Sequence, residues 1–465
     1  MTPARTGAPR VGIAGLGYMG LATALGFAAH GRRVYGYDVK PEIREAVRRG
    51  ETPYQEPGLG ALLRSQRTSD RFRVVDSPEE LVGESEGVFL CVPTPSRPSG
   101  RIELAPLKRS AAEIGEALRQ VTGYRVVVVK STVVPGTTET VVAPSLYRHS
   151  GRPARAIGVA SNPEFLAEGT MVYDTVHPER IVVGATDPKA LRWLERVYRP
   201  FGAPVLTLSP SGAELVKYSS NAFLALKVSF ANEVARLADR LGCNIDDVMA
   251  AVGRDPRIGS RFLRAGPGFG GSCFGKDLRA IVVRGRELGV RLRSAEAALR
   301  INDEQLAYVL ATVRRAVGGL NGKHIALLGL AFKAGTDDVR ESRALPIAAE
   351  LVVQGATVRA HDPVAIPNFR DAWRELSVPA GGRLEFCESV ERAVANADAA
   401  ILQADWPNYT RWKPTWTRRM RRPLLVDLRR AVDPVAAQRA GLSVVALGAG
   451  TAFVQGRRKS SRGAA

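Results

Sequence analysis

Residues 11–38 read VGIAGLGYMGLATALGFAAHGRRVYGYD and contain a complete strand, turn, helix and strand. The apolar run 11–14 predicts a strand, the small-residue run 21–29 a helix, and 34–37 a second strand. A GxGxxG turn separates the first strand from the helix. Its glycines permit a tight turn and let the backbone approach a pyrophosphate at the helix N-terminus. In this context the motif predicts a dinucleotide-binding site.

An acidic residue, Asp38, ends the second strand, about 20 residues after the glycine turn. A carboxylate at this place accepts hydrogen bonds from the ribose 2′-OH and repels a 2′-phosphate, which favours NAD over NADP. The residues that we expect to contact the cofactor here are Gly15, Gly17, Tyr18, Met19, Gly20, Asp38 and Lys40.

Strands and helices continue to alternate beyond this unit, which predicts a parallel, doubly wound α/β sheet. Further strands are expected at 87–92, 125–130, 156–160 and 180–183. Helical spacing without breakers then runs over 211–241 and again over 294–317. A second α/β unit follows, with strands at 324–330, 356–361, 399–402, 423–427 and 442–447.

The pattern predicts two Rossmann-like doubly wound domains joined by a central helical dimerisation segment. We expect a cofactor domain over 1–200, a helical and catalytic-loop domain over 201–305, a second Rossmann-like domain over 318–452, and a disordered basic tail over 453–465.

The chain is strongly basic, with a formal net charge of +20. Such a charge favours anionic partners: nucleic acid, a membrane surface or a phosphate-bearing substrate. We favour a solvated basic surface, with the tail able to contact anionic surfaces, because no nucleic-acid-binding module is recognisable. Four widely spaced cysteines, no signal peptide and no run of ~18 apolar residues predict a cytoplasmic protein without disulfides, zinc or a membrane span.

The best candidate for a nucleophile is Cys273, within GPGFGGSCFGKD (266–277). The glycines leave backbone N–H groups free to face an anion. Lys276 beside the thiol is expected to favour the thiolate, and Asp277 to orient a base or a water. The alternative is a buried structural cysteine.

Two further groups have suitable spacing for catalysis. Lys217 and Asn221 are four residues apart in the predicted long helix, so they share one face and together offer donors for an oxyanion. Glu164 and Glu168 are also four residues apart and would face the same way if their turn is helical. Thr132 follows an apolar strand, at the end where ligands bind in such sheets.

Seven motifs in order give the chain a resemblance to a known family. They are GLGYMG (15–20), EPGL (56–59), KSTVVPG (130–136), NPEFLAEG (162–169), ELVKYSSNAFLALKVSFANE (214–233), GFGGSCFGKD (268–277) and GLAFKAGTDDVRES (329–342). Over about residues 10–450 the chain resembles the UDP-glucose/GDP-mannose dehydrogenases. The resemblance implies a homodimer that uses NAD to oxidise a nucleotide sugar, UDP-glucose before GDP-mannose, in two steps.

The resemblance also implies roles for single residues. Cys273 would be the nucleophile, Lys217 and Asn221 the oxyanion pair, and Thr132, Glu164 and Asp277 the group that handles water and protons. The substrate contacts would be Glu168, Arg257 (donated by a partner subunit), Phe262, Phe269, Gly270, Lys276 and Lys333. Further cofactor contacts would be Pro93, Thr94, Thr132, Glu168, Lys276 and Arg340. No metal is implied.

Some positions depart from the family pattern. Gly275 and Arg343 stand where the family usually has proline, Ala167 where arginine is common, and Ala404-Asp405-Trp406 where Thr-Glu-Trp is usual. None of these changes removes a catalytic group. The alternatives to a UDP-glucose enzyme are a GDP-mannose or UDP-N-acetylhexosamine dehydrogenase, a polyanion-binding protein, and a non-catalytic nucleotide-sugar sensor.

Overall fold

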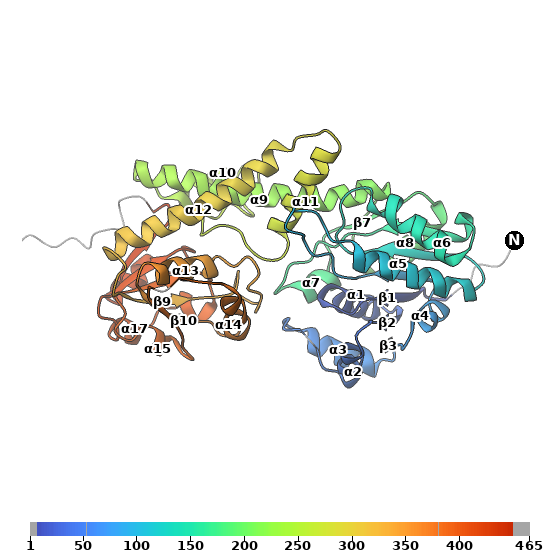
Figure 1. The fold of residues 1–465 in the computed structure, drawn as a ribbon, viewed down its shortest axis with the longest axis horizontal. Helices are drawn as coiled ribbons and strands as arrows, with labels where there is room; N and C mark the ends of the chain where they lie inside the picture. Colours follow the sequence, from blue (N-terminus) through green and yellow to red (C-terminus); the bar gives the residue numbers. More distant parts are fainter. Residues whose placement is uncertain (1–6, 53, 380, 450–465) are drawn as a thin grey trace, which may run out of the picture. The chain divides into compact units, whose positions relative to one another are not determined.

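The computed structural model describes residues 7–52, 54–379 and 381–449. They fall into two compact units, one from Met1–Ser220 with Ala280–Val290 and one from Asn221–Arg279 with Arg291–Ala465 (Figure 1). The predicted tail, 453–465, lies outside the described residues.

The first unit is built on an eight-stranded sheet with the order β3-β2-β1-β4-β5-β6-β7-β8. Its strands are β1 (Arg10–Ala14), β2 (Arg33–Tyr37), β3 (Phe72–Val74), β4 (Gly87–Leu90), β5 (Arg125–Val129), β6 (Ile157–Ser161), β7 (Ile181–Ala185) and β8 (Val205–Leu208). The strand order reverses between β1 and β4, which is where doubly wound sheets bind ligands.

The expectation of a wholly parallel sheet is wrong for one pair. Strands β6 and β7 run antiparallel, with Ala160 opposite Ala185. The chain therefore re-enters the sheet at the edge where β6 ends. As a result the connection 162–180, which includes NPEFLAEG, begins and ends at the carboxyl edge of β6.

Helices cover both faces of this sheet. They are α1 (Tyr18–Ala29), α2 (Pro41–Arg49), α3 (Leu59–Thr68), α4 (Pro78–Glu84), α5 (Ala105–Ala117), α6 (Ala143–Ser150), α7 (Met171–Val176) and α8 (Pro188–Tyr198). Strand β5 shows why two cores form: Val126 and Val128 pack with α1, α3 and α8, whereas Val127 and Val129 pack with α4, α5 and α6. Strand β5 is therefore buried on both faces, which explains its unbroken run of valines.

The second unit contains a six-stranded parallel sheet with the order β11-β10-β9-β12-β13-β14. Its strands are β9 (His324–Leu328), β10 (Thr357–His361), β11 (Arg383–Phe386), β12 (Ala399–Leu402), β13 (Leu424–Asp427) and β14 (Ser443–Ala446). Its helices are α13 (Ala344–Val353), α14 (Ile366–Glu375), α15 (Val390–Ala393), α16 (Pro407–Thr410), α17 (Pro414–Thr417) and α18 (Pro434–Arg439).

Four helices make up the segment between the two sheets in the sequence: α9 (Pro210–Leu241), α10 (Ile245–Gly253), α11 (Phe274–Glu287) and α12 (Arg293–Val317). Helix α9 has 32 residues, about 48 Å at the usual helical rise. The predicted fold class, two Rossmann-like domains with a central helical segment, is confirmed. Within the described residues no helix combines the length and the apolar character that crossing a membrane requires.

Candidate active site

The glycine turn after β1 has the geometry that a dinucleotide site needs. Gly15 has φ +99°, and a Cβ there would lie 2.6 Å from the Cys91 carbonyl oxygen. A Cβ on Gly20 would lie 1.9 Å from the Gly15 oxygen, so the helix can pack this closely only with glycine. Gly17 precedes α1, and a Cβ there would meet only the Tyr54 hydroxyl, at 3.8 Å. The turn is therefore open beside Gly17, where a pyrophosphate would lie.

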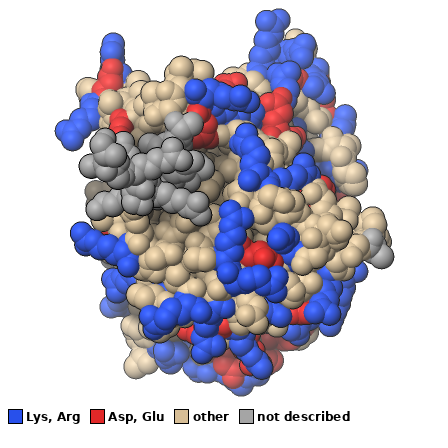
Figure 2. Space-filling view, turned by 90° about the vertical axis from the view of Figure 1, so that its left-hand side faces the viewer, with Lys and Arg blue, Asp and Glu red and all other residues tan. Residues whose placement is uncertain are grey.

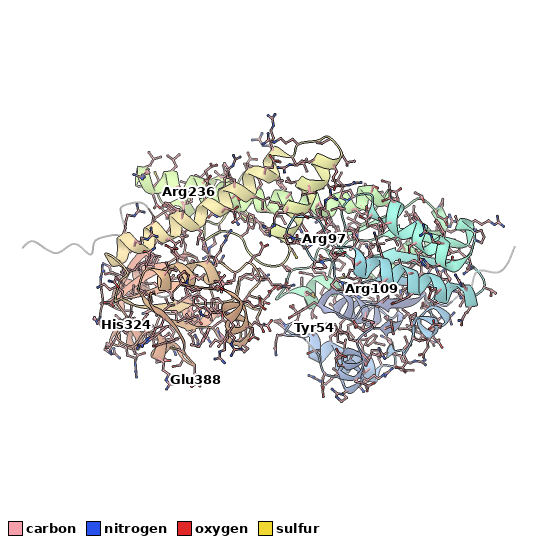
Figure 3. All side chains as sticks on the ribbon, in the orientation of Figure 1. Tyr54, Arg97, Arg109, Arg236, His324 and Glu388 are labelled. Carbon is pink, nitrogen blue, oxygen red and sulfur yellow. The ribbon has the colours of Figure 1, made fainter. Side chains whose placement is uncertain are left out.

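Asp38 is buried and holds this turn. Its carboxylate accepts hydrogen bonds from Leu16 N at 2.7 Å and from Lys40 N at 3.0 Å. Lys40 itself is exposed, and Tyr18 and Met19 are half-buried at the start of α1. The Tyr18 ring lies 4.2 Å, centroid to centroid, from Tyr54, which Figure 3 labels. Asp38 thus stands where the prediction requires it and also stabilises the turn.

The loops after β4 and β5 meet at the switch point of the sheet. The Thr94 hydroxyl donates to the Thr132 carbonyl oxygen at 2.8 Å, and Pro93 is exposed next to it. Strands β4 and β5 follow β1 in the sheet order, so Pro93, Thr94 and Thr132 share the carboxyl edge with the glycine turn. This is the edge at which such sheets bind cofactors.

Two buried carboxylates that the sequence analysis did not single out hold the loops of this edge. Glu214, at the start of α9, accepts hydrogen bonds from Gly136 N at 2.6 Å, Thr138 N at 2.9 Å and the Thr138 hydroxyl at 2.6 Å. Glu56 accepts hydrogen bonds from the backbone N–H groups of residues 169 and 171, at 2.9 and 2.8 Å. Each lies in a quoted motif, but sequence spacing gives no sign of which backbone groups it binds.

Glu164 and Glu168 do not share a helical face, contrary to the conditional expectation. Residues 162–167 have no helical hydrogen bonding and lead into a turn at 168–170. The reason is that Glu164 caps its own loop, with its carboxylate accepting from Leu166 N at 2.6 Å. Side-chain bonds to nearby backbone groups of this kind compete with helix formation.

Lys217 forms a nearly buried ion pair with Glu164, with 2.8 Å between the ammonium and the carboxylate. Burial alone would raise the pKa of Glu164, but the charge and hydrogen bond of Lys217 outweigh it and hold that pKa below its usual value. A second cation, Lys130, donates to the Asn162 side-chain oxygen at 3.0 Å. Burial lowers the pKa of Lys130 to about 8. Glu164 is therefore an ionised carboxylate beside a cation.

The second unit carries the nucleophile candidate. Cys273 is a half-buried free cysteine directly before α11, and its carbonyl oxygen accepts from Asp277 N at 2.8 Å. The Ser272 hydroxyl lies 3.5 Å from the Cys273 sulfur. The N-terminal end of a helix stabilises negative charge, so the position suits an anionic sulfur.

Asp277 is buried one turn into α11 and binds two donors. The Asn221 side-chain amide donates to one carboxylate oxygen at 2.7 Å, and the Lys276 ammonium pairs with the other. The ion pair places the Lys276 ammonium at the carboxylate of Asp277, and its effect on the thiol of Cys273 stays a prediction. Lys217 and Asn221 are one turn apart on α9, although their partners belong to different units.

The expected substrate contacts of the second unit, and the expected cofactor contact Arg340, lie in three segments. Phe262 has φ +67° and is 42% exposed, whereas Phe269 is buried and its ring meets that of Phe274 edge-on. Lys333 lies over the Phe332 ring, with 5.5 Å from ammonium to centroid. The Arg340 guanidinium binds both oxygens of the Asp338 carboxylate.

Arg257 is the most exposed of these residues. Its side chain is 87% exposed and pairs with Asp255 two residues earlier. The expected contribution of Arg257 to a partner subunit stays a prediction.

Three models of one family match successive parts of the chain. They describe the NAD binding domain (residues 9–202), the central domain (211–304) and the UDP binding domain (326–434) of the UDP-glucose/GDP-mannose dehydrogenases. The chain belongs to this family. It is thus a nucleotide-sugar dehydrogenase by descent, and NAD is the cofactor of its first domain, as predicted.

Individual relatives cover nearly the whole chain. A UDP-glucose 6-dehydrogenase of Haloferax volcanii is 38% identical over 90% of this chain and 96% of its own. A GDP-mannose 6-dehydrogenase of Pseudomonas aeruginosa is 35% identical over 84% and 91%. Among solved structures, a UDP-glucose dehydrogenase from Pyrobaculum islandicum has a TM-score of 0.86 and 39% identity, covering 98% of this chain and 99% of that one.

Proposed function

We propose that the protein oxidises C6 of UDP-glucose to the carboxylate of UDP-glucuronate, with Cys273 as a covalent nucleophile. The observation that carries the proposal is the position of Cys273: a half-buried thiol, not joined in a disulfide, at the N-terminus of α11, one turn before the buried Asp277. A thiol that only filled space in a core would need neither the glycine-rich loop nor the charged neighbours.

The reaction removes four electrons from one carbon. Two molecules of NAD, held in turn by the glycine turn and Asp38, would supply the oxidising power, one for each of the two hydrides that this carbon loses. After the first, the Cys273 sulfur adds to the aldehyde and forms a thiohemiacetal, which the second oxidation converts to a thioester. Water then attacks the thioester, releases the carboxylate and restores the thiol. Covalent capture keeps the aldehyde from escaping between the two oxidations.

We assign a role in this reaction to each of the other candidate catalytic residues from the contacts that it makes. Lys217 and Asn221 are the donors for the oxyanion that forms during sulfur attack and hydrolysis. Glu164, ionised by its pairing with Lys217, accepts a proton from water, and Asp277 holds Asn221 in place. Thr132 orients the water at the carboxyl edge of the first sheet.

The second sheet and the loops before it would hold the nucleotide sugar. Lys333 offers a cation for the phosphates, and Phe262 and Phe269 offer aromatic rings. We keep the division into 1–200, 201–305 and 318–452 as a proposal, with the cofactor in the first part and the sugar nucleotide in the last.

We further propose that the protein acts as a homodimer joined along α9. Five large apolar side chains of this helix are exposed: Leu215 (47%) and, further along, Phe223 (63%), Phe230 (46%), Leu237 (57%) and Leu241 (67%), of which the last four form a regular series. Their spacing of seven, seven and four residues places them on one helical stripe. A second copy of the chain would cover the stripe, and Arg257 would then reach the partner's site.

The face shown in Figure 2 gives no separate support to a polyanion-binding function. On the face shown in Figure 2, Lys and Arg side chains are scattered among neutral and acidic residues. GDP-mannose is the near alternative substrate, because a GDP-mannose enzyme is among the relatives. A non-catalytic sensor would have no use for the thiol and the ion pairs around it.

The test is to mix the protein with NAD and UDP-glucose and to count NADH formed for each sugar consumed. Two NADH per sugar, with UDP-glucuronate as product, is the expected result. Turnover of GDP-mannose alone would reassign the substrate, and no turnover of any nucleotide sugar by a protein that binds NAD would favour a sensor. Cys273→Ala should form no acid while NAD still binds; normal turnover by that variant would exclude the covalent role.

A further inference from the structure

The loop that carries Cys273 is attached to its surroundings mainly by polar side chains. Three buried amides bind its first half. The Asn232 oxygen accepts from Gly266 N at 2.8 Å, and the Gln305 amide donates to Gly266 O at 2.8 Å. Asn302 binds both backbone groups of Phe269, accepting from N at 2.7 Å and donating to O at 3.2 Å. The donors and acceptors therefore fix where the loop lies.

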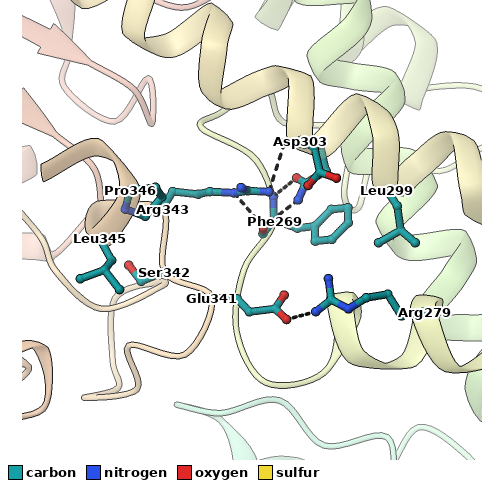
Figure 4. A pocket seen from close by; sticks show the side chains of 10 residues that line it. Phe269, Arg279, Leu299, Asp303, Glu341, Ser342, Arg343, Leu345 and Pro346 are labelled. Carbon is teal, nitrogen blue, oxygen red and sulfur yellow. Dashed lines mark hydrogen bonds and ion pairs between the residues drawn. The ribbon is translucent and has the colours of Figure 1, made fainter. Parts of the chain in front are cut away.

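Arg343 adds a further attachment, from the second Rossmann-like sheet. Its Nε donates to the Phe269 carbonyl oxygen at 3.2 Å, and its Nη2 donates to the Asn302 carbonyl oxygen at 3.1 Å (Figure 4). The planar guanidinium thus links the loop to α12 through one rigid group. Burial lowers the pKa of Arg343, and the nearby Asp303 and Glu341 carboxylates act in the opposite direction.

The turn just before Arg343 contacts the second half of the loop. Gly271 N donates to the Arg340 carbonyl oxygen at 3.0 Å. A Cβ on Gly270 would lie 2.3 Å from the Glu341 carbonyl oxygen, and one on Gly275 would lie 2.0 Å from its carboxylate. The Glu341 carboxylate in turn pairs with Arg279 on α11. Gly275, which stands where the family usually has proline, therefore leaves room for the ion pair of Glu341 with Arg279.

A cavity of about 310 Å³ lies next to this attachment, lined among others by Phe269, Arg279, Leu299 and Arg343. Apolar packing is therefore incomplete on this side of the loop. Where apolar packing is incomplete, the loop is held in place by hydrogen bonds, and these are lost when the donor side chain is removed. Arg343 is the donor from the second sheet that binds two carbonyl oxygens here.

We infer that Arg343 is a positioning residue: it ties the Cys273 loop to the 340–343 turn and so sets the place of the nucleophile relative to the sugar-nucleotide domain. The inference rests on the proposed function for its catalytic consequence. Lys333 and Arg340 belong to the connection that ends at Arg343. Arg343 would therefore hold the Cys273 loop against the same connection that binds the nucleotide. Both elements lie in the second unit.

The experiment compares Arg343→Met with Arg343→Lys and with the control Arg374→Met. Arg374 is an exposed arginine of the same unit that pairs only with Asp371 among the contacts described. Arg343→Met should lower kcat by about tenfold with little change in KM for NAD, since the cofactor turn is in the first unit. Arg343→Lys should recover part of the rate, because its ammonium can reach one carbonyl oxygen but has no fork for two.

Hydrogen–deuterium exchange gives a readout that needs no turnover. In Arg343→Met, peptides covering 266–275 should exchange faster, while the rest of the unit and the melting temperature stay unchanged. Faster exchange throughout the unit would mean a general structural role, and unchanged exchange or unchanged kcat would also overturn the inference. If the unmodified protein turns over no nucleotide sugar, the proposed function fails, and exchange still decides whether Arg343 holds the loop.

Discussion

The carboxylate of Asp38 binds Leu16 N and Lys40 N, and the same arrangement recurs in the second sheet. There the Asp362 carboxylate, just after β10, accepts from Leu330 N at 2.8 Å and Ala331 N at 3.2 Å. Asp362 also accepts from Val364 N and Ala365 N, as Asp38 does from Lys40 N. The two sheets differ in a side-chain contact, because the Trp406 indole donates to Asp362 at 3.1 Å. Among the described contacts of Asp38, no side chain donates to its carboxylate. The carboxylate oxygens therefore keep lone pairs that can accept from a ribose hydroxyl.

Asp38→Asn should therefore change cofactor choice more than fold. The asparagine oxygen can still accept from Leu16 N, but the charge that repels a 2′-phosphate is lost. We expect the ratio of NADP to NAD affinity to rise about tenfold, or about 1.4 kcal/mol. Fluorescence titration of both cofactors measures it. Asp371→Asn, an exposed change in the second unit, is the control, and an unaltered ratio in Asp38→Asn would argue against the assigned role.

At the scale of elements, Glu214 joins α9 to the segment that follows the Thr132 loop. Burial raises the pKa of Glu214 to about 7, although three hydrogen bonds act in the opposite direction. A carboxyl group whose pKa is higher in the folded state stabilises the fold fully below its unfolded pKa. That contribution is lost as pH rises through about 7. The shift corresponds to roughly 3 kcal/mol at about 1.4 kcal/mol per unit.

We therefore expect the thermal midpoint of the first unit to fall between pH 5 and pH 7.5, and the fall to be smaller in Glu214→Gln, which has no proton to lose. Thermal unfolding followed at several pH values measures the slope. Glu42→Gln, an exposed change on α2 of the same unit, should keep the slope of the unmodified protein. An equal slope in Glu214→Gln would assign the pH dependence to another group.

Long periodic elements were predictable, whereas short ones were not. The helices at 210–241 and 293–317 and the valine strand β5 have patterns that burial imposes along the whole element. Strands β3, β8 and β11 have three or four residues each, and β8 is largely exposed, so little burial shapes their sequences. The antiparallel entry of β7 depends on the preceding loop, which hydrophobic periodicity does not describe.

The same contrast holds in the candidate site. Cys273, Lys217 and the glycine turn stand in motifs whose chemistry can be read directly from the residue types. The supports of the site cannot be read in this way, because Glu214 and Arg343 bind backbone groups more than 70 residues away. Main-chain N–H and C=O groups look alike at every position, so a sequence does not show which of them a buried side chain will meet.

At the scale of the whole molecule, the proposed dimer predicts that one site uses residues of two chains. Arg257 extends from its own chain, whereas Cys273 and Asp277 lie together on one loop and helix. Two inactive variants, Arg257→Ala and Cys273→Ala, should therefore restore activity when coexpressed. A mixed dimer would contain one site with both residues intact.

Random pairing makes half of the dimers mixed, and each has one complete site, so we expect about a quarter of normal activity. Differently tagged chains allow the mixed dimer to be purified and its turnover measured. Cys273→Ala with Asp277→Asn is the matched control: both residues belong to the same chain's site, so no mixed dimer gains a complete one. Activity in the control pair would mean that subunits share more than Arg257. Failure of the first pair to recover any activity would place Arg257 in its own chain's site or outside the site altogether.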